Sequence, residues 1–238
     1  MDKNYPNKQE AKEIVLDHQE LNNCQEAGEL VITDFPYLKE IKTKTDDGAE
    51  SFISGMKNKG INDPEAYLTR DQIRSLEALY RHSSNSNNKV TNIKIVNCPQ
   101  LEEVDISNFE GNKELIINSP KLKILNCSKN QLTDLTLISC SNIAWLDCND
   151  NQFTNLDFLQ NLSSKNLERL GIRNNNFSPT DLTPLENFTN LKMLQLGNNH
   201  FYDSLEPLKN MDELKSLDIG DTDIDSGLEY LPESLEEL

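Results

Sequence analysis

Apolar residues recur along this chain in a fixed eleven-letter pattern, L-x-x-L-x-L-x-x-N-x-L. Good copies are LKILNCSKNQL, IAWLDCNDNQF, LERLGIRNNNF, LKMLQLGNNHF and LKSLDIGDTDI, and LEEVDISNFEG is a weaker one. They start at positions 101, 122, 143, 167, 191 and 214, so the spacing is 21 to 24 residues. The L-x-L alternation indicates a short strand with one face inward, and a parallel strand needs a crossover before the next. The spacing therefore predicts one turn of a solenoid per copy.

The ninth letter of most copies is asparagine. Its amide can satisfy backbone groups where the strand bends away, which an apolar side chain could not do. The four residues at this position are Asn130, Asn151, Asn175 and Asn199.

The segments that return from one copy to the next change along the chain. VTNIKIVNC (90–98) and LTDLTLISC (132–140) alternate like strands. Later returns carry an apolar residue every three positions, which suits a helical or 3-10 turn. These residues are Leu182, Leu185 and Phe188, and then Leu205, Leu208 and Met211. We expect extended returns early and helical or 3-10 returns late.

Three regions follow from the pattern. Residues 1–45 hold poor copies, AKEIVLDHQEL and LKEIKTKT, and we interpret them as degenerate N-terminal repeats or a cap. Residues 46–89 interrupt the array. Asp63 and Pro64 favour a helix start there, an apolar face follows, and HSSNSNN is a polar linker, so a helical insertion is predicted. Residues 90–238 form the solenoid proper. Its last letters, LEEL, begin one more copy, which suggests an incomplete repeat and a fragment.

The repeat resembles the leucine-rich-repeat family. The 21-residue copies followed by 23- or 24-residue copies, with DKNYP near the start and DTDIDSGLEYLPESLEEL at the end, look like large fungal families of this kind. The resemblance implies an α/β fold, a leucine-rich-repeat solenoid with its parallel sheet on the concave side, and a role in protein binding. Such modules also occur beside protein kinase domains. A regulatory region of a larger, possibly kinase-linked, enzyme is therefore the alternative, although this chain carries no kinase motif.

The composition limits the classes of partner that the chain is expected to bind. The formal net charge of -17 argues against nucleic acid and anionic membrane surfaces, and it favours basic partners. No apolar run approaches 18 residues, and MDKNYPNKQE lacks a signal core. We therefore expect a cytoplasmic monomer that binds a protein or peptide. An extracellular receptor fragment would need a signal sequence and disulfide caps.

Catalytic or metal chemistry is not expected. Cys148 lies beside Asp147 and Asp150, but these acids would raise its pKa, and no base is near. Cys148 and Cys127 occupy the apolar sixth letter, so core packing explains them, and we expect no disulfide between them in a reducing compartment. The acidic run GDTDIDSGLE lacks the Gly and Glu of a calcium loop and is better explained as a turn. No cofactor is predicted, and the chain is not expected to be an enzyme.

The exposed letters of the strands remain as candidates. In-register strands would place the third letters Ile124, Trp145, Arg169 and Met193 in one lateral row, with the seventh-letter Arg173 beside it. Trp and Arg are enriched at binding hot spots, so we predict that these five residues bind the partner. The alternative is that Trp145 lies flat on its neighbours with Arg169 stacked on it.

Overall fold

The computed structural model describes residues 12–16, 28–43, 90–109 and 111–238. The predicted helical insertion and its polar linker (46–89) lie outside the described residues, as does most of the region 1–45.

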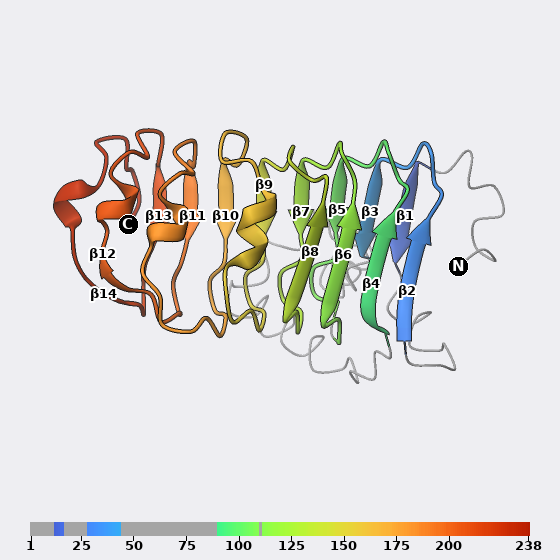
Figure 1. Ribbon diagram of the computed structural model, residues 1–238, viewed down its shortest axis with the longest axis horizontal. Coiled ribbons are helices and arrows are strands. Elements are labelled where there is room, and N and C mark those ends of the chain that lie inside the picture. Colours follow the sequence, from blue (N-terminus) through green and yellow to red (C-terminus); the bar gives the residue numbers. More distant parts are fainter. Residues whose placement is uncertain (1–11, 17–27, 44–89, 110) are drawn as a thin grey trace, which may run out of the picture. The chain divides into compact units, whose positions relative to one another are not determined.

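The described chain is a parallel β-solenoid, as the repeat predicts (Figure 1). One side of every coil contributes a strand to an eight-stranded sheet, whose neighbours follow the order of the sequence. The order is β1 (Glu13–Leu16), β3 (Glu40–Thr43), β5 (Glu103–Asp105), β7 (Ile124–Asn126), β9 (Trp145–Asp147), β10 (Arg169–Gly171), β11 (Met193–Gln195) and β13 (Ser216–Asp218).

The return side changes its structure along the chain, which confirms the expected switch. The first returns form a four-stranded parallel sheet of β2 (Gly28–Thr33), β4 (Val90–Val96), β6 (Glu114–Asn118) and β8 (Asp134–Ile138). The later returns carry the 3-10 helices η2 (Asp157–Asn161), η3 (Thr183–Leu185), η4 (Glu206–Leu208) and η5 (Leu228–Tyr230). Among the described residues, none of the helices has the length and apolar character of a membrane span.

Two further strands lie on the late return side, β12 (Tyr202–Ser204) and β14 (Asp223–Ser226), and they pair in parallel. The interpretation of GDTDIDSGLE as a turn is therefore wrong for Asp223 and Asp225, which lie in β14. Backbone pairing with β12 places them in an extended segment, and both of these side chains are exposed.

The sheets continue across the interruption that the sequence shows at 46–88. Strand β3 pairs directly with β5, with Glu40 opposite Glu103, and β2 pairs with β4, with Leu30 opposite Ile93. The array is thus interrupted in sequence, but the described strands on either side of the interruption keep its register.

The core is a narrow strip between the two sides. The fourth letters of the repeats are buried, and so are the eleventh-letter phenylalanines Phe153, Phe177 and Phe201. Phe109 is buried as well, but it occupies the ninth letter of its copy, where other copies have asparagine. Each coil stacks on its neighbours, so one row of apolar side chains is covered from both sides. This arrangement explains how a chain with 36% apolar residues buries a continuous core.

The turn after each strand uses a left-handed backbone at the eighth letter. Asn108, Lys129, Asp150, Asn174, Asn198 and Asp221 have φ between 52° and 60°. Asn and Asp tolerate this conformation better than other side chains. The feature explains why polar residues precede the ninth-letter asparagine in most copies.

The ninth-letter asparagines satisfy backbone groups at the turn, as predicted, and they also join neighbouring coils. Asn151 Nδ2 donates to the carbonyl oxygens of Cys127, Cys148 and Asn149 at 3.0, 3.1 and 3.1 Å. Its Oδ1 accepts from the backbone N–H of Leu132 at 3.0 Å. Asn130, Asn175 and Asn199 donate in the same way. In each of these four coils, one asparagine side chain therefore satisfies carbonyl groups that the turn would leave unpaired.

Candidate functional site

The third letters of the repeats form the lateral row that the sequence predicts. Strand pairing places Trp145 opposite both Ile124 and Arg169, and Arg169 opposite Met193. We call Ile124, Trp145, Arg169 and Met193 the third-position row. All four project from the outer face of the eight-stranded sheet, on β7, β9, β10 and β11 respectively.

Trp145 is the most prominent member of the third-position row. It is 37% exposed, whereas Ile124 and Met193 are half-buried. The Arg169 guanidinium carbon lies 5.6 Å from the Trp145 ring centroid, within cation–π range. The structure therefore contains the stacked pair of the alternative interpretation, and a part of the indole still faces solvent.

Arg173 does not stand free beside the row. Its Nη1 lies 3.1 Å from Asp218 Oδ2 on β13, two coils away. The contact between Arg173 and Asp218 passes over Gly197, where a Cβ would lie 2.7 Å from Asp218 Oδ1. A glycine at the seventh letter thus lets the carboxylate reach the guanidinium. Any partner of Arg173 would have to compete with Asp218.

A second crossing contact was not foreseen. Asn149 Nδ2 donates to Gln195 Oε1 at 2.9 Å, and Asn149 Oδ1 accepts from the backbone N–H of Arg173 at 2.7 Å. The side chain passes over Gly171, where a Cβ would lie 2.7 Å from Asn149 Nδ2. The glycine at the fifth letter of one copy was the signal for this contact in the sequence.

Carboxylates border the row on β5 and β9. The Oδ1 atoms of Asp105 and Asp147 accept the backbone N–H two residues further on, at 2.9 and 3.0 Å. Burial raises the pKa of Asp147, and the negative charges of Asp150 and Asp105 raise it further. The third-position row therefore lies beside a half-buried carboxylate, Asp147, whose charge is poorly solvated.

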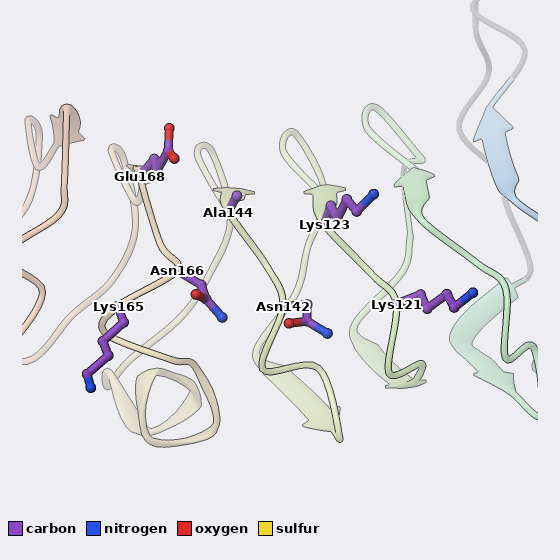
Figure 2. Close-up of a pocket in the computed structure, with 7 residues that line it drawn as sticks. All are labelled: Lys121, Lys123, Asn142, Ala144, Lys165, Asn166 and Glu168. Atoms are coloured by element: carbon purple, nitrogen blue, oxygen red, sulfur yellow. The ribbon is translucent and has the colours of Figure 1, made fainter.

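A shallow hollow of about 380 Å³ lies on the turns that enter β7, β9 and β10 (Figure 2). It is lined by Lys121, Lys123, Asn142, Ala144, Lys165, Asn166 and Glu168. In Figure 2, Lys121 and Lys123 point away from its centre, toward the preceding coil. There Lys121 Nζ donates to Gln100 Oε1, and Lys123 Nζ lies 2.8 Å from Glu102. The hollow exists because Ala144 replaces a longer side chain at the second letter.

The cysteines belong to the core, as expected for the four that the structure describes. Cys98, Cys127, Cys140 and Cys148 are all buried. Burial raises the pKa of Cys148 well above the usual thiol range, and the adjacent Cys127 thiol raises it further. Within the described ranges, no group of His, Cys, Asp or Glu side chains is placed to hold a metal ion.

The protein is a parallel β-solenoid, and the third-position row lies on the outer face of its eight-stranded sheet. No protein-family model matches the chain, and no curated protein matches it either.

Proposed function

We propose that this chain is a leucine-rich-repeat protein and acts as a non-catalytic interaction module. Two features support the family assignment: the L-x-x-L-x-L-x-x-N-x-L repeat, and the asparagine at its ninth letter, which bonds three carbonyl groups across adjacent coils. The binding surface would be the third-position row, and the partner a protein or peptide that lies across the strands.

The observation that carries this proposal is the exposure of Trp145 within an in-register row. An indole that is 37% exposed on a sheet of polar side chains leaves apolar area in contact with water. Covering it, together with the half-buried Ile124 and Met193, would release that water. Buried aromatic and arginine side chains dominate the free energy of many interfaces, and Trp145 with Arg169 provides such a pair.

The test is affinity capture from a lysate with Trp145→Ala/Arg169→Ala beside the wild type. Proteins that bind the row should be retained by the wild type and lost by the double variant. Once a partner is identified, its Kd should rise at least about thirtyfold, since hot-spot truncations cost about 2 kcal/mol or more.

The matched control is Tyr202→Ala/Lys209→Ala, which removes an exposed aromatic residue and a cation from the return side. This variant should capture the same proteins as the wild type. Equal capture by both double variants, with circular dichroism showing intact folds, would reject the third-position row as the binding surface.

A further inference from the structure

Two thiols face each other in the core between the coils of β7 and β9. Cys127 and Cys148 follow these strands directly, and their Sγ atoms are 3.5 Å apart. Both side chains are fully buried. The Cys127 N–H donates to the Asp147 carbonyl at 2.8 Å, so the two segments are adjacent and aligned. Neighbouring strands lie about 4.8 Å apart, inside the Cα separation of roughly 4.4–6.8 Å that a disulfide requires.

The other two described cysteines form a natural comparison. Cys98 and Cys140 are equally buried, but the coil that carries Ser119 lies between theirs. Ser119 Oγ donates to the Cys98 carbonyl at 3.4 Å, and Cys140 Sγ donates to the Ile117 carbonyl at 3.6 Å. Two coil spacings, about 9.6 Å, exceed the reach of a disulfide. Among the described cysteines, one pair of sulfurs is thus within bonding range and one pair is out of it.

The geometry points to Cys127 and Cys148 as an oxidation site that hydrogen peroxide converts into an internal disulfide. The thiolate of one cysteine attacks a peroxide oxygen, the O–O bond breaks, and a sulfenic acid and one water form. The sulfur of the second cysteine then attacks the sulfenic sulfur. The S–S bond forms, the S–O bond breaks, and the hydroxide leaves with the second thiol proton as water. Two thiols lose two electrons and one peroxide becomes two waters.

Burial makes this reaction slow and selective. The raised pKa of Cys148 keeps its thiol protonated in the closed coil, so the first attack needs a transient opening or alkaline conditions. On closing, the coil brings the second sulfur within 3.5 Å of the sulfenic acid and excludes larger thiols from the core. The resulting bond would tether the coils that carry Ile124 and Trp145.

The experiment treats the reduced full chain with hydrogen peroxide at pH 8 and pH 9.5, blocks the remaining thiols, and maps non-reduced peptides by mass spectrometry. The expected product is one linked peptide pair containing Cys127 and Cys148, formed faster at pH 9.5. Cys98 and Cys140 should remain alkylatable after unfolding. The oxidised chain should unfold at a higher urea concentration than the reduced chain, and dithiothreitol should reverse the shift.

Two variants sharpen the result. Cys148→Ser should abolish the linked pair, and Ser119→Cys should create a second one, because it places a thiol on the coil between Cys98 and Cys140. Recovery of Cys127 and Cys148 as free thiols, as sulfinic acids, or bonded to other cysteines would overturn the proposal. If either variant fails to fold, the peptide map of the oxidised wild-type chain is by itself sufficient to test the proposed disulfide. It is also independent of the third-position row, which the capture experiment tests separately.

Discussion

Asp147 and Asn126 occupy the same position in adjacent coils and make the same backbone contact. Asn126 Oδ1 accepts the Ser128 N–H at 3.2 Å, and Asp147 Oδ1 accepts the Asn149 N–H at 3.0 Å. Of these two side chains, only Asp147 is an acid and can carry a charge at this half-buried position. Burial raises its pKa, so the charged form is disfavoured in the fold while the hydrogen bond needs only an oxygen.

Asp147→Asn should therefore raise the free energy of unfolding at pH 7, by on the order of 1 kcal/mol. Because the folded-state pKa lies above the unfolded value, the folded chain holds this proton more tightly. The contribution of Asp147 to wild-type stability is consequently unfavourable at pH 7, and this cost disappears as the pH falls through the folded pKa. The advantage of the variant should vanish below about pH 4, where both states are protonated. Urea unfolding at pH 7 and pH 3.5 measures both effects.

The exposed Asp134→Asn serves as the control at the same change of charge, and it should alter stability little at either pH. A lower stability of Asp147→Asn at pH 7 would show that the carboxylate, despite its burial, contributes favourably to the fold.

At the scale of the element, strand β10 illustrates how small residues shape the sheet face. Gly171 leaves room for Asn149 to cross from the coil of β9 to Gln195 on β11. Gly197 does the same for the contact between Arg173 and Asp218. The polar contacts beside the third-position row therefore skip one strand each, and they depend on the absence of a Cβ in between.

Gly171→Ala should destabilise the chain by about 1–2 kcal/mol, because its Cβ would lie 2.7 Å from Asn149 Nδ2 and displace that side chain. In the background of Asn149→Ala the same substitution should cost much less. A double-mutant cycle in urea measures the coupling. Strictly additive effects would indicate that Asn149 moves aside freely and that the contact with Gln195 contributes little.

The sequence predicts those elements whose side chains alternate between core and solvent. The eight-stranded sheet of the solenoid and the third-position row follow from the repeat, since parallel pairing in register fixes which residues are neighbours. Strands β12 and β14 escaped prediction because their side chains are mostly exposed and show no apolar alternation. The crossing of Asn149 to Gln195 joins residues 46 positions apart, which no local spacing reveals. The hollow around Ala144 lies where this copy has alanine at the second letter and other copies have lysine or glutamate.

At the scale of the whole chain, the link between β3 and β4 differs from its counterparts. Residues 106–113 connect β5 to β6 and residues 127–133 connect β7 to β8, whereas residues 44–89 lie between β3 and β4. The strands on either side nevertheless pair in the register of the array. The pairing of the solenoid strands thus does not require a short link at this place.

Replacing residues 44–89 by the eight-residue sequence ISNFEGNK of residues 106–113 should leave a folded solenoid. We expect an unchanged β-type circular dichroism spectrum and a Tm within about 4 °C of the wild type, because a change of 1 kcal/mol shifts Tm by roughly 2–4 °C in a chain of this size. A replacement by glycine and serine of the same length controls for the turn sequence. Loss of cooperative unfolding in both would show that residues 44–89 are needed for the fold.

The strictly sequential strand order has a mechanical consequence. The backbone of every strand in the eight-stranded sheet pairs only with strands of the adjacent coils. A chain pulled from its two ends would therefore unravel from an end inward, one coil after another, without shearing the whole sheet at once. Each coil of 21–24 residues would release roughly 70–85 Å of contour length. Under tension the solenoid would extend in a series of small steps, with one coil unfolding in each step.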